Sequence, residues 1–281
     1  ALETPDTLFS QAIGEAPVVL ARAGTSGADG TTAPSVEARL PDRLPASLLR
    51  YPRALTAIPE LDDVALGHGL ANAEPDADGL YRKLPLLLRV GETPVPGFAL
   101  EVTRVAKGAD AIGWGGDRVT LGNLSVPVSD RGEMRLRFGR FPASAQISAV
   151  TLLQQGGAAD LKGKAVLIGT AAEGTVDIAA TPLEPKLWGV LIQAQGVDAL
   201  LRGSGWLDRP RWAAAAEWGA ALLLALLALW LLPRRGRGQW LVPAAAVALF
   251  VGAWAAFEVG ALLLDPLPGV TVTVASAIAI G

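Results

Sequence analysis

The chain has 281 residues, 51% of them hydrophobic, and a mean hydropathy of +0.38. These values are too apolar for an average soluble domain, yet 18% charged residues are too many for a protein lying wholly in a membrane. The net charge of −3 argues against nucleic acid as a partner. The sequence contains no cysteine, which excludes disulfides and thiolate metal sites.

Its single histidine, His68, lies in "VALGHGL", which we expect to be a strand. One histidine without cysteine supplies too few ligands for a His-based metal site. His68 is also the only residue around which a His-dependent nucleophilic site could be built. A structural role is favoured over a catalytic one by its sequence context.

The polar and apolar residues divide the chain into two regions, which we place at 1–211 and 212–281. The second region holds apolar runs near 213–232, 240–257 and 266–281. A helix rises 1.5 Å per residue, so each of the first two runs is close to the length that crosses a hydrocarbon core of about 30 Å. We interpret the third, shorter run as a span that continues past Gly281.

The orientation of these spans is predicted by the basic residues between the first two, which are Arg234, Arg235 and Arg237. Loops rich in arginine stay in the cytoplasm. Region 1–211 is therefore expected outside the cytoplasm. We expect a multi-pass protein of the bacterial inner membrane, in contact with membrane lipids.

Within the first region, hydrophobic periodicity predicts alternating helices and strands. Helices are expected at 6–16, 97–108, 147–155 and 189–203, and strands at 17–23, 64–70 and 164–170, with a turn that enters a strand in 73–90 and several strands joined by turns in 117–140. Gly203 after Arg202 is a typical helix C-terminal signal. This order predicts an α/β domain around a mixed sheet, with transmembrane helices after it.

Two of these elements carry a face prediction. In the helix at 97–108, the inward face is expected to hold Phe98, Val102, Val105 and Ala106. In the strand near 133–138, Met134, Leu136 and Phe138 are expected inside and Glu133, Arg135 and Arg137 outside, because side chains alternate along a strand.

The segment Lys164–Leu183, "KAVLIGTAAEGTVDIAATPL", has nearly the glycine spacing of a phosphate-binding loop. Gly174 is followed directly by Thr175, so the lysine that such a loop needs is missing. Glu173 also adds negative charge where phosphate would lie. We interpret the segment as a strand followed by an ordinary loop.

The ordered pieces resemble the CHASE2 family of extracytoplasmic sensor domains. They are "EPDADGLYRKLPLLLRVGETPVPGFALEVTRVA", "GEMRLRFGR", "LKGKAVLIGTAAEGTVDIAATPL" and "GVLIQAQGVDALLRGSGWLDRPRW", followed by three apolar runs. The resemblance covers about Pro5 to Gly281, and the ordered set is more specific than any one piece.

Two departures from the family pattern matter. The family begins with a membrane span and a strand–helix–strand, so we expect the N-terminal part of the domain to be missing before Ala1. The family also often has a Pro-Gly-Val-x-x-His-Ala segment where this chain has Trp188 to Ala194, with Gln193 in place of the histidine. A role tied to that histidine cannot be carried over.

The resemblance implies an input module of a receptor, attached to a cytoplasmic adenylate or guanylate cyclase, a histidine kinase or a Ser/Thr kinase. We favour an adenylate cyclase. No catalytic residue, metal or cofactor is expected in this segment, and ATP with Mg or Mn would serve only the absent effector domain. The expected partners are a second copy of the chain and an unknown extracytoplasmic ligand or envelope protein.

Several residues are candidates for ligand binding. Arg82, Lys83 and Arg89 form a basic cluster on one predicted strand, either a solvated face or a site for an anionic ligand or lipid headgroup. Asp177 follows a predicted strand, where α/β folds place their sites, or else it caps the next turn. Asp78 is expected in a turn with Gly79.

Two other functions compete with the sensor. An envelope assembly protein would use the outer domain to bind another protein and the spans only as an anchor. A transporter or channel is disfavoured, because Glu217 and Glu258 lie near span ends and no polar pathway crosses the first two spans.

Overall fold

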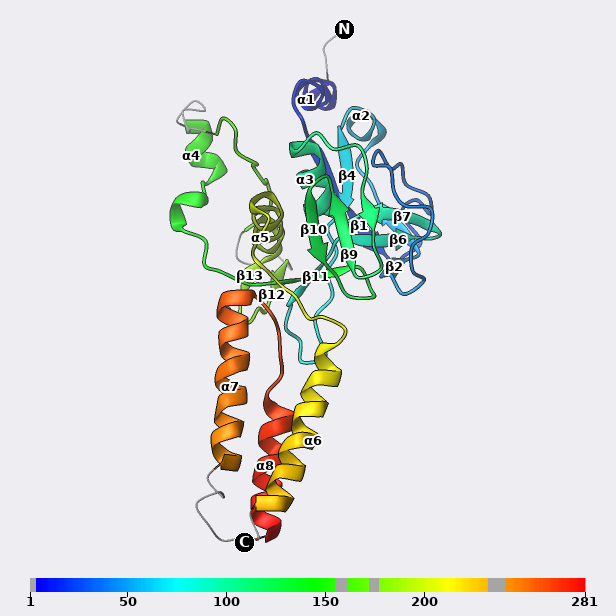
Figure 1. Ribbon diagram of the computed structural model, residues 1–281. Coiled ribbons are helices and arrows are strands. Elements are labelled where there is room, and N and C mark those ends of the chain that lie inside the picture. Colours follow the sequence, from blue (N-terminus) through cyan, green and yellow to red (C-terminus); the bar gives the residue numbers. More distant parts are fainter. Residues whose placement is uncertain (1–3, 155–160, 172–176, 232–240, 281) are drawn as a thin grey trace. The chain divides into compact units, whose positions relative to one another are not determined.

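A computed structural model of the protein describes residues 4–154, 161–171, 177–231 and 241–280. The chain divides between Trp206 and Leu207 into an α/β unit, residues 1–206, and a helical unit, residues 207–281 (Figure 1). The predicted fold class, a mixed-sheet α/β domain with C-terminal apolar helices, is confirmed.

The α/β unit consists of short elements. Its helices are α1 (Pro5–Gly14), α2 (Pro59–Asp62), α3 (Phe98–Ala106), α4 (Ala149–Gln154) and α5 (Gly189–Arg202), with a 3₁₀ turn at Ala143–Ala145. Its strands are β1 (Val19–Thr25), β2 (Arg50–Tyr51), β3 (Arg53–Leu55), β4 (Gly67–Leu70), β5 (Lys83–Pro85), β6 (Leu87–Val90), β7 (Thr93–Pro96), β8 (Gly113–Trp114), β9 (Arg118–Leu121), β10 (Leu124–Pro127), β11 (Glu133–Leu136), β12 (Ile178–Ala179), β13 (Leu187–Trp188) and β14 (Trp206–Leu207).

Among the described residues, these strands form several small sheets rather than one. The mixed sheet has the order β3-β1-β4, with β1 parallel to β4 and antiparallel to β3. The other sheets are β2-β6-β7, the meander β10-β9-β8, β14-β11-β5 and the pair β12-β13. The parallel pair β1–β4 positions the site described below, because both strands end at the same edge.

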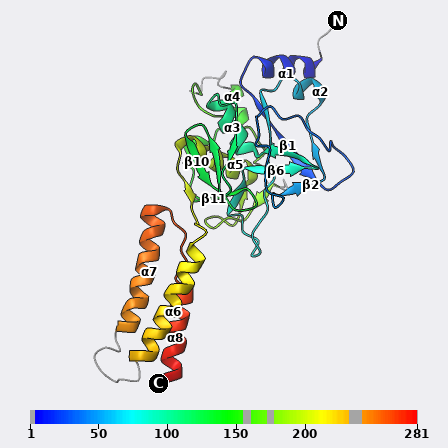
Figure 2. The ribbon, with the colours of Figure 1, turned by 45° about the vertical axis from the view of Figure 1, so that its right-hand side comes forward.

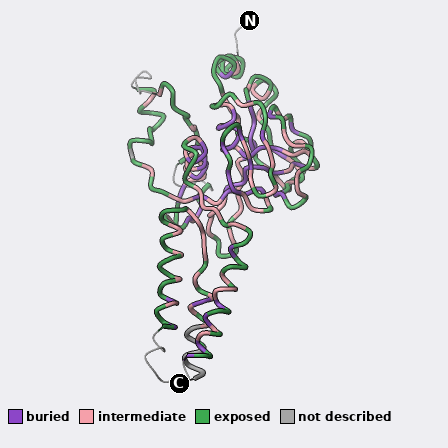
Figure 3. The backbone as a smooth tube through the Cα atoms, viewed as in Figure 1, coloured by how far each residue is buried: buried purple, intermediate pink, exposed green. Residues whose placement is uncertain are grey.

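The strand predicted in 73–90 is split at Leu86, and Arg82 lies before it. Its first half, β5, pairs with β11, and its second half, β6, pairs with β2 and β7. Nearly every residue from Leu84 to Val90 is buried, and Leu86, Leu87 and Leu88 are fully so. This run is the centre of the α/β core, which is coloured purple in Figure 3.

Helix α3 forms where expected, but the predicted inward face is wrong. The residues that are buried are Ala99, Leu100, Glu101, Thr103 and Arg104, while the four predicted ones are intermediate or exposed. The helix packs against β1 and β4 on one side and α5 on another, so it buries a wide face. The charges of that face are satisfied internally, since Arg104 donates to both carboxylate oxygens of Glu101 at 2.8 and 2.7 Å.

Strand β11 confirms the expected burial of Met134 and Leu136, whereas Phe138 lies beyond the strand and is half-buried. The expected exposure of Glu133 is wrong, because only 4% of the residue is exposed. Its carboxylate instead accepts a hydrogen bond from Ser129 Oγ at 3.2 Å. Burial raises the pKa of Glu133 above its ordinary value.

The strand predicted at 164–170 does not form. These residues have no regular secondary structure, and Val166 and Ile168 are 53% and 96% exposed. Among the described residues, no strand lies beside this apolar run to pair its backbone groups. Helix α4, predicted at 147–155, is confirmed at Ala149–Gln154 with none of its residues buried (Figure 1).

Helix α5 confirms the expected bounds and C-terminal signal. Gly203 has a φ of 70°, the left-handed conformation that glycine adopts without a steric penalty, and its N–H donates to Leu200 O. The buried side of α5 includes Ile192, Gln193 and Val197. Its packing against α3 makes it part of the main core.

The helical unit contains α6 (Ala213–Leu231), α7 (Leu241–Gly260) and α8 (Leu267–Ile280). Helices α6 and α8 run side by side in Figures 1 and 2, and the close approach of Gly269 to Leu224 and Leu249 places the start of α8 against both other helices. Among the described residues, α6 and α7 are long and apolar enough to cross a membrane. Helix α8, with 14 residues and a rise of about 21 Å, is shorter than a full span.

The apolar surface of α6 and α7 is mostly uncovered. Only 22% of the most hydrophobic window of α6 and 11% of that of α7 are buried. Helices of a soluble core would hide these side chains from water, whereas lipid tails accommodate them. Figure 3 shows α7 largely in green, the colour of exposed residues, and α6 in a mixture of green, pink and purple.

Candidate functional site

A pocket of about 300 Å³ lies in the α/β unit. It is lined by residues from β1, from the segment after β4, from the β12–β13 pair and from the first turn of α5, which are Ala23, Ala71, Asn72, Ala73, Tyr81, Asp177, Ile178, Ala179, Gly189, Ile192 and Gln193. Residues 71–73 follow the end of β4, and Ala23 lies near the end of its parallel neighbour β1. Ligands of open α/β sheets bind at this edge, outside the carboxyl ends of parallel strands.

Side chain and backbone contacts fix two walls of the pocket. The side-chain amide of Asn72 bonds to the backbone of Gly24 as a neighbouring strand would. Its Oδ1 accepts from the Gly24 N–H at 2.6 Å, and its Nδ2 donates to the Gly24 carbonyl oxygen at 3.0 Å. On the other side, the Tyr81 N–H donates to Ala180 O at 2.8 Å and ties the β12 segment to the start of β5. The pocket is therefore built from segments far apart in the sequence.

Asp177, which the sequence named as a candidate site residue, lines the pocket. It is exposed, and its carboxylate lies against the backbone of Gly189, the first residue of α5. The Gly189 N–H donates to the Asp177 carbonyl oxygen at 3.1 Å. A helix N-terminus carries partial positive charge and favours a carboxylate there. Asp177 therefore lies in the pocket lining beside the start of α5, whose N-cap residue is Trp188, and its role in ligand binding stays a prediction.

Gln193 is the most buried polar side chain of the lining, with 6% of the residue exposed. Its Nε2 donates to Ala71 O at 2.8 Å. Its Oε1 is buried and has no hydrogen-bond partner among the described residues. Gln193 occupies the position where the family pattern often has histidine.

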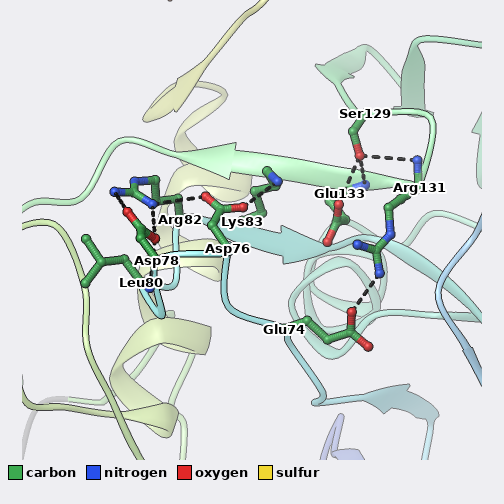
Figure 4. Close-up of polar contacts among 9 residues, drawn as sticks. All are labelled: Glu74, Asp76, Asp78, Leu80, Arg82, Lys83, Ser129, Arg131 and Glu133. Atoms are coloured by element: carbon green, nitrogen blue, oxygen red, sulfur yellow. Dashed lines mark hydrogen bonds and ion pairs between the residues drawn. The ribbon is translucent and has the colours of Figure 1, made fainter.

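The predicted basic cluster is not a set of free cations. Arg82 donates to both Asp78 carboxylate oxygens at 2.8 and 2.7 Å and to Asp76 at 3.2 Å, and Lys83 contacts Asp76 at 2.6 Å (Figure 4). The hydrogen bonds from Arg82 lower the pKa of Asp78 to about 2. An anionic ligand at these cations would have to displace the carboxylates.

Arg89 lies apart from Arg82 and Lys83, on β6, and donates to the carbonyl oxygens of Glu92 and Leu44 at 3.1 and 3.2 Å. Asp78 and Gly79 form the expected turn, since Gly79 has a φ of 81° and the Leu80 N–H donates to Asp78 Oδ1 at 3.2 Å. The structure therefore brings Arg82 and Lys83 together, and neither they nor Arg89 line the pocket with Asp177.

His68 belongs to a second buried polar group in the α/β unit. Its Nδ1 lies 2.9 Å from Glu37 Oε1, and its Nε2 lies 3.2 Å from Asp62 Oδ1, an ion-pair distance without hydrogen-bond alignment. Arg22, 3% exposed, contacts Asp62 at 2.6 Å and Ser35 at 2.7 and 2.8 Å. These contacts join α2, β1 and β4, which supports the structural role expected for His68.

The helical unit contains a polar junction of its own. Arg209 donates to the two carboxylate oxygens of Glu217, on α6, at 3.0 and 2.9 Å and to Leu263 O at 2.9 Å. The Asp265 N–H, just before α8, donates to Glu217 at 2.7 Å. The junction thus links the segment that enters α6 with the segment that enters α8. Arg234, Arg235 and Arg237 lie outside the described residues.

The geometry defines a class of protein, an α/β unit with a small pocket followed by apolar helices that could span a membrane. The CHASE2 domain model matches residues 2–233, and the chain belongs to the CHASE2 family. No curated protein and no solved structure matches the chain. CHASE2 domains lie outside the cytoplasm and act in sensing for signal transduction.

Asp177 lies in the pocket lining, and its ligand role stays a prediction, whereas Asn72, Tyr81 and Gln193 were not assigned to a site from the sequence. The helical spacing of the sequence indicates that Gln193 faces inward, because it falls on the same helix face as the buried Gly196, Val197 and Leu200. A polar side chain on an apolar helix face needs a partner inside the protein. Asn72 had a weaker signal, its position directly after a strand.

Proposed function

We propose that this chain is the extracytoplasmic input region and membrane anchor of a CHASE2-containing adenylate cyclase in the bacterial inner membrane. The observation that carries the proposal is the CHASE2 match across the α/β unit together with the apolar helices after it. The cytoplasmic domain would convert ATP to cyclic AMP with Mg or Mn. The described residues would supply recognition and transmission, and no catalytic group.

The proposed topology has three spans. Helices α6 and α7 cross the membrane, and the run at 266–281 enters it as the third span. Arg234, Arg235 and Arg237 hold the loop between the first two spans in the cytoplasm. Residues 1–211 then lie outside, and the third span leads into the cytoplasm toward the effector.

Transmission requires that a signal prefers one of two arrangements of the chain, since a ligand shifts an equilibrium only by its differential affinity. Ten residues, 203–212, separate the end of helix α5, which contributes to the pocket, from the start of α6. The Arg209–Glu217 junction then connects the entry of α6 to the entry of α8. We propose that two copies pair, so that the arrangement of these helices controls a paired cytoplasmic effector.

The test uses the natural protein that contains this chain, with its cytoplasmic effector domain, expressed in a bacterial strain without its own adenylate cyclase. The account predicts cyclic AMP production that changes several-fold when residues 1–206 are deleted. Phosphate transfer in place of cyclic AMP would identify a histidine or Ser/Thr kinase as the effector. The absence of both products would favour an envelope assembly protein.

A further inference from the structure

We propose that the pocket of the α/β unit binds a small organic amine, whose positively charged nitrogen is held by the Asp177 carboxylate. The inference rests on the proposed sensor function and names the chemical class of the signal. It is carried by the size of the pocket, the charge of its lining and a buried acceptor that has no partner among the described residues.

The size of the pocket limits the ligand. Its volume of about 300 Å³ lies at the lower end of the range for ligand sites. Since a water molecule occupies about 30 Å³ in the liquid, the pocket has room for a molecule of roughly ten non-hydrogen atoms. The side chains of Ala73, Ile178 and Ile192 supply apolar contact for its carbon chain.

The charge of the lining favours a cation. Among the described lining residues, Asp177 alone carries a charge, and Arg82 and Lys83 are paired with Asp76 and Asp78 outside the lining. The positive end of α5 is already faced by the Asp177 carboxylate. An anion would therefore meet a negative charge without a compensating cation, whereas an ammonium group would form charge-assisted hydrogen bonds.

Gln193 adds an acceptor on the α5 side of the pocket. Its buried Oε1 lacks a hydrogen-bond partner among the described residues, which is uncommon in folded proteins because a buried polar atom without a partner loses its hydration uncompensated. A ligand with a second N–H group could supply that partner after a small rotation of the amide. The two acceptors, the Asp177 carboxylate and Gln193 Oε1, have no charged donor beside them in the described lining, so they favour a ligand with several N–H donors.

The positions of these two acceptors suggest how binding would be transmitted. Asp177 precedes β12, and Gln193 lies in the first turns of α5. A diamine that contacts both would hold the β12–β13 pair against the start of α5. Such a ligand would stabilise one arrangement of the helix that leads toward α6.

The experiment is isothermal titration of the full chain in lipid nanodiscs with three probes of matched length, 1,4-diaminobutane, 1,4-butanediol and succinate. The proposal predicts that the diamine binds, that the diol binds at least tenfold more weakly and that succinate does not bind. Asp177→Asn should weaken diamine binding at least tenfold and Gln193→Leu severalfold. The matched control is Asp29→Asn, which removes the same charge from an exposed residue outside the pocket lining.

Binding of succinate or of the diol as tight as that of the diamine would overturn the proposal. So would an unchanged diamine affinity in Asp177→Asn, or no diamine binding up to 10 mM, a concentration on the order of the weakest useful affinities. The outcome is separable from the sensor function. If the diamine fails to bind but deletion of residues 1–206 still alters effector output, the ligand class is wrong and the sensor role stands. If the diamine binds but that deletion leaves output unchanged, the ligand class stands and the sensor role is wrong.

Discussion

The carboxylate of Asp177 rests on the backbone of Gly189, at the first residue of α5, so closely that no side chain fits between them. This contact joins a residue of the pocket to α5, the last helix of the α/β unit. It depends on glycine because any Cβ atom at position 189 would overlap the carboxylate.

Gly189→Ala is therefore expected to displace the Asp177 carboxylate. Because this carboxylate is the free end of an exposed side chain, it can move aside, so the loss of unfolding free energy should stay below about 1 kcal/mol while diamine affinity falls. The measurement is the thermal unfolding midpoint with and without 1,4-diaminobutane. Gly139→Ala is the matched control, because a Cβ atom at that position meets nothing within 4 Å. Equal effects of the two substitutions would contradict the contact.

Asp62→Ala is expected to destabilise the α/β unit strongly. It leaves the buried Arg22 guanidinium without its ion-pair partner, and breaking a buried pair in this way costs about 3–5 kcal/mol. Chemical denaturation followed by tryptophan fluorescence measures the loss. Asp63→Ala, at the exposed neighbouring residue, should change stability by less than about 0.5 kcal/mol.

The lowered pKa of Glu37 predicts that the protein loses stability in acid. Burial alone would raise its pKa, but the hydrogen bond and charge of His68 hold the pKa below the ordinary value of 4.5. A carboxyl group with a lowered folded-state pKa contributes stability that is complete above about pH 4.5 and is lost as the pH falls through the folded value. The unfolding midpoint of the wild type should thus fall more between pH 6 and pH 3.5 than that of Glu37→Gln. Parallel pH profiles of the two unfolding midpoints would contradict a lowered pKa of Glu37.

The raised pKa of Glu133 predicts the opposite dependence of stability on pH. Burial raises its pKa, so its ionised form is disfavoured in the folded protein, and stability is lost as the pH rises from 4.5 through the folded value. Glu133→Gln should therefore raise the unfolding midpoint at pH 7. The difference from wild type should shrink below pH 4.5, where the carboxyl group is protonated in both states. A destabilised Glu133→Gln at pH 7 would show that the Ser129 contact outweighs burial.

Arg209 and Glu217 are expected to be energetically coupled. The free energies of unfolding of Arg209→Ala, Glu217→Ala and the double variant form a double-mutant cycle. This cycle should give a coupling energy of about 1–2 kcal/mol, because the pair makes two charge-assisted hydrogen bonds. The cycle contains its own control, since additive effects would mean that the pair is not coupled. Glu217→Ala should leave diamine binding unchanged.

Much of the fold could be predicted from local sequence signals. Helix α5 was predictable because apolar periodicity ends at a glycine that adopts a positive φ, and the Asp78–Gly79 turn because its residues favour that conformation. The residues of 164–170 were misassigned as a strand because strand formation needs a partner, which local composition does not specify. The inward face of α3 was missed because packing on several sides buries Glu101 and Arg104 as a pair.

The candidate site was only partly predictable for the same reason. Asp177 was a candidate because of its expected place after a strand, but that strand does not form, and the strands whose ends lie at the pocket are β1 and β4. Asn72 and Tyr81 reach the pocket through contacts with Gly24 and Ala180, which are distant in sequence. Arg82 and Lys83 looked like a ligand cluster because their pairing with Asp76 and Asp78 depends on how the turn folds.

The measurement that tests the central claim most directly is the labelling of single cysteines in right-side-out membrane vesicles. The chain has no cysteine of its own, so Asp29→Cys and Arg235→Cys each provide one reactive site. An extracytoplasmic sensor predicts that a membrane-impermeant maleimide labels Asp29→Cys in intact vesicles and Arg235→Cys only after permeabilisation. Labelling of Arg235→Cys in intact vesicles, with Asp29→Cys protected, would place the α/β unit in the cytoplasm and contradict the account.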